Sequence, residues 1–240
     1  MTRRSLTVGK DRFMVGPWHD EPSVAYVSLA PSAAVLTSRA GVERCVDQLR
    51  RDGYRGAVTA ALRSNDAYVF RSAGFEVKER LHVLRHDLRN LPPVPPDLAR
   101  RMRRSRRRDR PAVLEVDRLA FDPFWTLGPD GLDEALHATT SVRFRVAGDP
   151  AGAGLLAGYA VCGRATDIGY LQRLAVHPDH LRQGVGAALV LDSLQWLKRR
   201  RCRVMLVNTQ ESNEAALALY LRLGFTLETE HLTVLAWDDE

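Results

Sequence analysis

Residues 167–187 constrain the fold most, because they predict a buried strand, a short loop and the start of a helix in one continuous stretch. An apolar run at 168–176 ends at His177-Pro178-Asp179, and apolar residues then recur at helical spacing. Gly184 and Gly186 stand where the helix begins, so little side-chain material covers the backbone there. The first N–H groups of a helix have no partner within it and bind anions. The stretch therefore predicts a phosphate site made of backbone, although a tight turn without a ligand explains the glycine pair equally well.

Three short motifs follow one another in the second half of the chain. They are Leu-Ala-Val-x-Pro at 174–178, Arg-Gln-Gly-Val-Gly-Ala at 182–187, and Ser-Asn-x-Ala-Ala-x-x-x-Tyr-x-x-x-Gly-Phe at 212–225. Their order and spacing resemble the GNAT superfamily of acetyl-CoA-dependent N-acyltransferases, and the resemblance covers residues 98–238. It implies an α/β (α+β) fold, the GNAT fold, in which helices flank a mixed, mostly antiparallel central sheet.

The resemblance also implies acetyl-CoA as cosubstrate, with its pantetheine arm paired to the end of the strand and its pyrophosphate on the start of the helix. Asn213 would hold the arm or cap a helix, and the two roles are compatible. The sequence departs from the family at Leu181, where Gln or Arg is usual, but a backbone site does not need that side chain. The implied binding positions are Leu174, Ala175, Val176, Arg182, Gln183, Gly184, Val185, Gly186, Ala187, Asn213 and Tyr220.

Three aromatic residues, Phe121, Phe124 and Trp125, stand between helices expected at 111–120 and 132–138. The pattern Ala-Phe-x-Pro-x-Trp resembles the ribosomal-protein alanine N-acetyltransferases. In many GNAT enzymes the corresponding segment walls the acceptor site, so the resemblance implies that these aromatic residues bind the substrate. They fit equally well as residues of the apolar core.

Acetyl transfer to an amine needs a neutral nucleophile and a proton for the departing thiolate. The resemblance assigns that proton to Tyr220, and the alternative is a tyrosine that only packs beside Phe225. The alanine N-acetyltransferases usually carry Glu where this chain has Asn208, and an amide accepts no proton at neutral pH. Glu211 is the remaining catalytic candidate for a base. Without one, water would carry the proton away from an amine that is already partly neutral.

Residues 23–88 resemble a second, degenerate half-copy of the same fold. Ser64-Asn65-Asp66-Ala67 and Gly74-Phe75 repeat the later Ser-Asn-Glu-Ala and Gly-Phe, and Phe70 takes the place of Tyr220. No glycine pair occurs at 34–41, so the copy would lack a phosphate site. The alternative is an unrelated N-terminal extension of a single domain.

The predicted domains are a degenerate GNAT-like domain at 1–89, a proline-rich linker at 90–97 that runs as a stiff, extended spacer, and a catalytic domain at 98–240. Residues 1–22 carry no clear structural signal. The other elements expected in the first domain are strands at 24–29 and 56–62 and helices at 41–51 and 66–73.

Eight arginines lie within Arg100–Arg110, in a chain whose formal net charge is +6. Clustered guanidinium groups bind phosphates, so this segment predicts a contact with RNA, a ribosome or an acidic protein. The alternative is a solvated edge strand that its charges keep soluble.

The three cysteines form no Cys-x-x-Cys pattern, so neither a disulfide framework nor a zinc site is indicated and no metal is expected. The first 25 residues show no signal-peptide pattern and no apolar stretch is long enough to span a membrane, which predicts a cytoplasmic protein without a membrane partner. The predicted function is N-acetyl transfer to a primary amine of a peptide, a protein N-terminus or a small molecule. The alternatives are a non-catalytic acyl-CoA-binding regulatory module and an arginine-rich protein of the ribosome or of nucleic acid. The pattern gives no oligomeric state.

Overall fold

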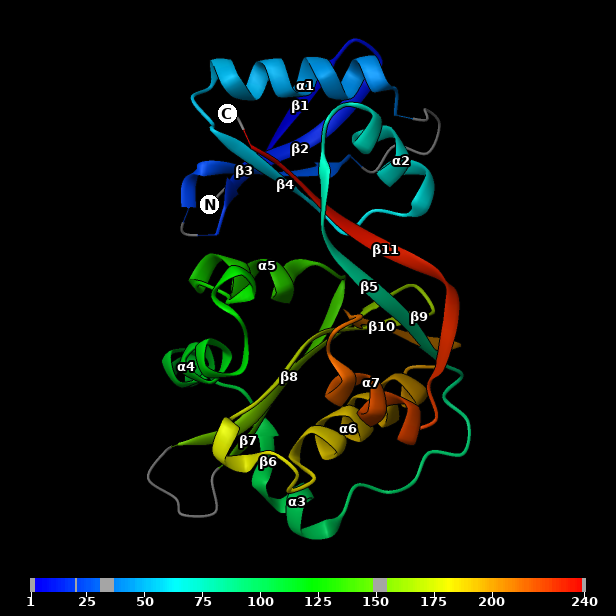
Figure 1. Ribbon diagram of the computed structural model, residues 1–240. Coiled ribbons are helices and arrows are strands. Elements are labelled where there is room, and N and C mark those ends of the chain that lie inside the picture. The colour runs from blue at the N-terminus through cyan, green and yellow to red at the C-terminus, as the bar shows by residue number, and fades with distance from the viewer. Residues whose placement is uncertain (1–2, 20, 31–36, 149–154, 239–240) are drawn as a thin grey trace. The chain divides into compact units, whose positions relative to one another are not determined.

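The computed structural model describes residues 3–19, 21–30, 37–148 and 155–238 (Figure 1). Contacts divide the chain into two compact units. The first unit comprises Met1–Val83, Thr209–Ser212 and Glu228–Glu240, and the second comprises Leu84–Asn208 and Asn213–Leu227. Each unit therefore contains segments from both halves of the chain. The boundary between sequence domains at 90–97 stays a prediction.

The first unit is a mixed sheet with two helices, α1 (Arg39–Arg51) and α2 (Ser64–Ser72). Its strands are β1 (Arg4–Val8), β2 (Asp11–Trp18), β3 (Glu21–Leu29) and β4 (Gly56–Thr59), with parts of β5 (Glu76–His86), β10 (Val204–Gln210) and β11 (Thr226–Asp238). β1, β2 and β3 pair antiparallel, β3 and β4 pair parallel, and β11 pairs antiparallel with β4. Phe13, Leu49 and Phe70 are among the residues that fill the core.

β1 and β2 form within residues 1–22, where the sequence pattern predicts nothing. Phe13 and Val15 are fully buried on β2, but their alternation covers too few positions before Gly16 to stand out in the sequence. Asp11, at the start of β2, is buried as well. Its carboxylate accepts hydrogen bonds from the backbone N–H and the hydroxyl of Ser38, at 3.0 and 2.8 Å. Because Ser38 caps α1, the carboxylate of Asp11 lies at the start of that helix.

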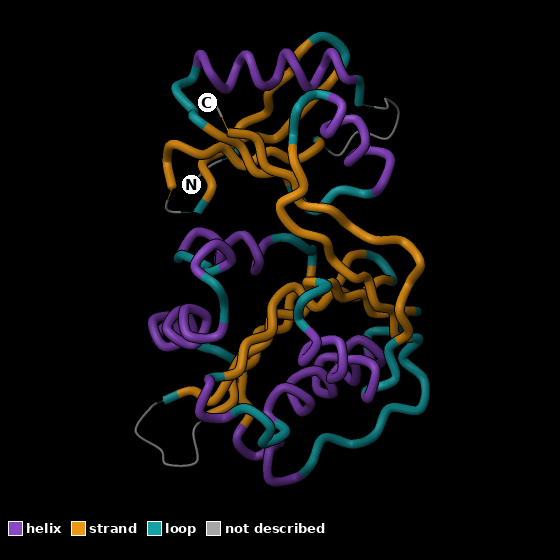
Figure 2. The backbone as a smooth tube through the Cα atoms, viewed as in Figure 1, coloured by secondary structure: helices purple, strands orange, loops and turns teal. Residues whose placement is uncertain are grey.

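The second unit is a sheet with helices on both faces (Figure 2). The helices are α3 (Pro96–Arg101), α4 (Arg110–Ala120), α5 (Pro129–His137), α6 (Val185–Arg199) and α7 (Glu214–Arg222). To parts of β5, β10 and β11 the unit adds β6 (Met102–Arg104), β7 (Ser141–Gly148), β8 (Leu156–Ala165) and β9 (Ile168–Val176). The 3₁₀ turns are η1 (Arg107–Asp109), η2 (Pro123–Trp125) and η3 (Pro178–His180). Strand order is β5-β10-β9-β8-β7-β6, antiparallel from β6 to β9 and parallel between β9 and β10.

β8 is the centre of the second unit, because apolar residues cover both of its faces. Tyr159 and Val161 pack with Val113 of α4 on one face. Ala160 packs with Leu194 of α6 on the other. A strand buried on two faces has a continuous apolar sequence instead of an alternating one, and residues 156–163 are all buried.

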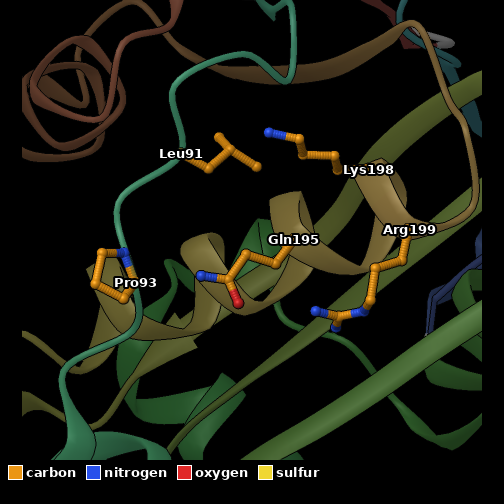
Figure 3. Close-up of a pocket in the computed structure, with 5 residues that line it drawn as sticks. All are labelled: Leu91, Pro93, Gln195, Lys198 and Arg199. Atoms are coloured by element: carbon orange, nitrogen blue, oxygen red, sulfur yellow. The ribbon is translucent and has the colours of Figure 1, made fainter.

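The proline-rich segment packs along α6. The carbonyl of Pro92 accepts a hydrogen bond from Nε2 of Gln195 at 3.0 Å, and Leu91 packs against the core. A surface pocket of about 540 Å³ lies between the segment and the helix (Figure 3); it is lined by Leu91, Pro93, Gln195, Lys198 and Arg199.

The cysteines form no disulfide among the described residues. Cys45, Cys162 and Cys202 are free and buried. No helix among the described residues is both long enough and apolar enough to cross a membrane.

The arginine-rich segment is partly engaged within the second unit. Arg103 donates to both carboxylate oxygens of Asp109 at 2.6 and 2.8 Å, and Arg110 pairs with Asp133. Arg101 donates to the carbonyl of Gly148 at 3.1 Å. The exposed members of the segment are Arg100, Arg104, Arg106, Arg107 and Arg108. Contact with RNA or a ribosome through these side chains stays a prediction.

Asp109 should stabilise the fold in a pH-dependent way. The hydrogen bonds from Arg103 lower the pKa of this buried carboxyl from 3.8 to about 2, against the opposing effect of burial. A pKa that is lower in the folded state stabilises the protein above the unfolded pKa, and the stabilisation is lost as pH falls through the folded one. Asp109→Asn should therefore cost about 2 kcal/mol at pH 7, and the difference from the unsubstituted protein should shrink between pH 4 and 2.

Urea unfolding at a series of pH values measures this difference. Asp97→Asn, which changes an exposed carboxylate on α3, is the control and should change the free energy of unfolding by less than about 0.5 kcal/mol. A cost for Asp109→Asn that stays constant down to pH 2 would show that the charge of this carboxylate is not what stabilises the fold.

Candidate active site

β9 and β10 pair at one end and separate at the other. The parallel register joins 168–170 to 204–206, and no further pairing joins the two strands among the described residues, although β9 continues to Val176. A register shift against β8 sets Val161 opposite Arg173 and Cys162 opposite Leu171, which leaves Gln172 as an extra residue in β9. Such a bulge bends its strand and increases the twist. The end of β9, residues 174–176, therefore has backbone groups on the β10 side that no strand pairs.

The loop after β9 leads into the glycine-rich start of α6. Gly184 is the N-cap residue, with φ of 81°, and it provides no side-chain cap. Arg182 also has a positive φ, 59°. Left-handed residues in such turns form concave surfaces of N–H groups that bind anions, and the dipole of the helix adds to the attraction. Arg182, Gln183 and Gly184 are exposed, so an anion can reach the predicted phosphate site.

The other residues of the predicted acetyl-CoA site differ in exposure. Leu181, where the family usually has a polar or basic side chain, is 57% exposed. Val185 is buried, whereas Gly186 and Ala187 are half-buried. On the strand, Ala175 is buried and Leu174 and Val176 are half-buried.

The end of β9, the start of α6 and α7 meet at Gly186. A Cβ atom added to this glycine would lie 3.4 Å from Val176 and 3.4 Å from Leu219. Asn213 caps α7 by accepting a hydrogen bond from the N–H of Ala216 at 2.9 Å, which confirms the predicted cap. The structure thus gathers into one region the strand end, the glycine pair and the helix of Tyr220.

Tyr220 is only 4% exposed and packs on Phe225, with ring centroids 5.4 Å apart. Burial raises the pKa of Tyr220 above its usual value of 10, so its hydroxyl keeps its proton throughout the neutral range. The packing contact predicted as the alternative is therefore present. It leaves the hydroxyl able to donate a hydrogen bond.

A buried ion pair holds the aromatic loop against β9. The carboxylate of Asp117 is fully buried and accepts two hydrogen bonds from Arg173, both at 2.7 Å. It also accepts hydrogen bonds from the hydroxyl of Tyr159 and, at 2.7 Å, from the N–H of Leu127. Arg173 in turn donates to the carbonyl of Trp125 at 2.7 Å. The loop that contains the aromatic residues is therefore fixed to the strand directly after the bulge.

The three aromatic residues differ in their surroundings, although all are half-buried. Phe121 packs on the apolar core, and the guanidinium carbon of Arg173 lies 3.5 Å from its ring centroid. Phe124 and Trp125 contact each other edge to face, with centroids 4.8 Å apart. Phe121 therefore fits the core interpretation, whereas binding of an acceptor by Phe124 and Trp125 stays a prediction.

Asn208 and Glu211, the two positions considered for a general base, belong to different units. Asn208 is exposed on β10, in the second unit, and Glu211 belongs to the first. Nδ1 of His231, also in the first unit, lies 2.9 Å from Oε1 of Glu211. The carboxylate is therefore already engaged by a neighbouring side chain, and its role as a base stays a prediction.

Comparison with known proteins agrees with this geometry, since residues 107–225 match the family model described as "Acetyltransferase (GNAT) family". This segment belongs to the GNAT family. The chain is 37% identical over 76 residues to the [ribosomal protein bS18]-alanine N-acetyltransferase of Escherichia coli K12, an alignment that spans 32% of this chain and 51% of that protein. The chain thus matches about half the length of this curated relative.

Solved structures show the same fold over nearly the whole chain. A tandem GNAT protein from the clavulanic acid biosynthesis pathway has a TM-score of 0.67 at 14% identity, covering 98% of this chain and 81% of its own. A GCN5-related N-acetyltransferase from Kribbella flavida has a TM-score of 0.64 at 16% identity, covering 100% and 90%. The GNAT fold class predicted from the sequence is confirmed, and the first likeness fits the predicted tandem repeat.

The segment predicted to be a half-copy, residues 23–88, shares one local feature with the GNAT segment. The N–H of Phe75 bonds to the carbonyl of Phe70 at 3.2 Å, as that of Phe225 does to Tyr220 at 3.1 Å. Each pair encloses a left-handed glycine, with φ of 93° and 88° respectively. α2 and α7 therefore end in the same way. The segment compared with the glycine pair, 34–41, is described only from residue 37, and there Ser38 caps α1 and donates to Asp11.

Asp117→Asn should destabilise the protein by about 3–5 kcal/mol, because Arg173 would keep a buried charge without its counter-ion. Urea unfolding measures the change. Asp179→Asn, at a side chain that is 85% exposed, should change the free energy of unfolding by less than about 0.5 kcal/mol. Equal stability of the two variants would contradict a structural role for the buried pair.

Proposed function

We propose that this protein is an N-acetyltransferase that moves an acetyl group from acetyl-CoA to a primary amine, on a protein N-terminus or a small molecule. The observation that carries the proposal is the meeting of an unpaired strand end, a glycine-rich helix start and the helix of Tyr220 around Gly186. Membership of residues 107–225 in the GNAT family supports it.

The described residues fit the chemistry of acetyl-CoA. Its pyrophosphate carries negative charge and needs N–H donors, which the exposed start of α6 supplies together with the charge of Arg182. Its pantetheine arm carries amide groups, and residues 174–176 have backbone groups free to pair with them. The glycine at position 184 is needed for this shape, because its φ of 81° is strained for other residues.

Tyr220 would donate a hydrogen bond to the sulfur of the leaving thiolate. Its raised pKa makes it a weak acid, so stabilisation of developing charge through a hydrogen bond describes its role better than complete proton transfer. Without that hydroxyl the region would still bind acetyl-CoA, as expected of a non-catalytic acyl-CoA-binding module.

The acceptor amine would enter as its own neutral form. Asn208 accepts no proton, and an α-amino group has a pKa near 8, so that a useful fraction is neutral at pH 7. Water or the solvent buffer would then remove the proton released on acetylation.

Gly186→Val should abolish the rise in Tm that acetyl-CoA causes, because the branched side chain would fill the space where α6, β9 and α7 meet. In the unsubstituted protein we expect a rise of about 5–10 °C when acetyl-CoA exceeds its Kd about 100-fold. Gly148→Val is the control, because an added Cβ there meets only a carbonyl oxygen at 3.8 Å. Gly41→Val cannot serve, since its Cβ would lie 1.9 Å from Oδ2 of Asp11. A normal shift in Gly186→Val would show that the acetyl-CoA site lies elsewhere.

Tyr220→Phe should lower kcat about 10²-fold and leave the acetyl-CoA-dependent rise in Tm unchanged. A steady-state acetylation assay with an amine panel, run beside the thermal shift, separates the two effects. Equal kcat values for the variant and the unsubstituted protein would exclude the hydroxyl from the reaction. Lack of activity in the unsubstituted protein, with intact acetyl-CoA binding, would favour the non-catalytic module.

The pH dependence of kcat/KM should follow the acceptor. With a peptide α-amine, of pKa about 8, and a lysine-like amine, of pKa about 10.4, the rising limb should move by roughly two pH units. A rising limb that stays at one pH for both amines would reveal a base on the protein.

A further inference from the structure

A cluster of two histidines and a glutamate lies within the first unit: His82 on β5, Glu211 directly after β10, and His231 on β11. One nitrogen or oxygen atom of each residue lies within 4.8 Å of those of the other two. The three residues are far apart in the sequence, so no spacing motif predicts a site there. The fold alone brings them together.

The three side chains lie close to one another at the surface of the first unit. Nδ1 of His231 is 2.9 Å from Oε1 of Glu211, and the rings of His82 and His231 have centroids 5.5 Å apart. The side chain of His231 is 46% exposed and that of Glu211 is 35% exposed. Solvent and small ions can therefore reach the cluster.

His82 has an unsatisfied atom. Its Nδ1 is buried and has no hydrogen-bond partner among the described residues. Buried polar nitrogens in folded proteins nearly always have a partner. An ion pair between Glu211 and His231 does not account for this nitrogen, whereas a cation bound through Nδ1 of His82 would.

We propose that His82, Glu211 and His231 bind a divalent transition-metal ion of the zinc type. Two imidazoles and one carboxylate form a ligand set that zinc accepts, with a fourth position left for water. Zinc bonds of 2.0–2.1 Å place tetrahedral ligand atoms roughly 3.3 Å apart, so the observed separations need only small side-chain rotations. Both imidazoles bind as neutral groups, and one carboxylate leaves a divalent ion partly compensated.

The backbone around the cluster holds two of the ligands in place. The N–H of Glu211 donates to the carbonyl of Arg80, two residues before His82, at 3.0 Å. Nε2 of Gln210 donates to the carboxylate of Glu79 at 2.9 Å. The end of β10 is thus fixed against β5 before any ion binds. A metal ion would add a link from these two segments to β11.

The test uses full-length, tag-free protein freed of metal with EDTA and titrated with Co²⁺ and Zn²⁺. We expect about one equivalent of each ion, visible absorption from a low-symmetry Co²⁺ site, and a Tm that rises with Zn²⁺ concentration. His82→Ala, Glu211→Gln and His231→Ala should each weaken binding more than the 10–100-fold typical of lost supporting contacts. The Tm values of these variants in EDTA show whether they fold. If an alanine variant does not fold, Glu211→Gln, which changes the side chain least, still tests the proposal.

Two matched controls separate ligation from general charge and from surface histidines. Glu230→Gln removes a carboxylate beside His231 on the same strand, and His137→Ala removes an exposed histidine of α5. Both should bind Co²⁺ and Zn²⁺ like the unsubstituted protein. Absence of binding at micromolar ion concentrations, or equal binding in the three cluster variants and the controls, would overturn the proposal.

Discussion

The buried ion pair between Asp117 and Arg173 is the interaction on which the candidate active site depends. A charge without a partner inside a protein costs several kcal/mol. The folded state must therefore keep α4, which carries Asp117, against β9, which carries Arg173. Arg173 directly follows the bulge at Gln172. The ion pair therefore also fixes the place where β9 separates from β10. A further hydrogen bond from Arg173 holds the carbonyl of Trp125.

The local features that rest on backbone geometry could be predicted from the sequence. A cradle of N–H groups needs a left-handed residue at position 184, which only glycine adopts without strain, and the cap of α7 needs an Asn at 213. Both requirements appear as local motifs, so the GNAT fold and the positions of its elements could be predicted. The ion pair of Asp117 and Arg173 was missed because its members lie on separate elements. Asp117 is fully buried on α4, whereas Leu119, an apolar residue of the same helix, is 38% exposed.

The start of α1 in the first unit differs from the start of α6 in the second. α1 also begins with unpaired N–H groups, but Ser38 caps the helix and itself donates to Asp11. Gly41, in the first turn, leaves only enough room for that carboxylate. The chain therefore supplies its own anion where the second unit leaves glycine backbone exposed. A helix start that already holds a carboxylate repels a phosphate, which agrees with the prediction that this segment lacks a phosphate site.

If the proposed function is right, the site offers neither a strong general acid nor a general base, so catalysis must depend on other effects. A tyrosine, with a usual pKa of about 10, is a weaker acid than a thiol, whose pKa is about 8.5, and burial raises the pKa of Tyr220 further. Complete transfer of its proton to the leaving thiolate would therefore be uphill. Asn208 accepts no proton from the amine. Most of the rate enhancement would then have to come from holding the thioester and a neutral amine in register. Parts of the second unit would serve that purpose: the bulged strand, the capped helix α7 and the loop that Arg173 holds are all positioned by hydrogen bonds within the protein.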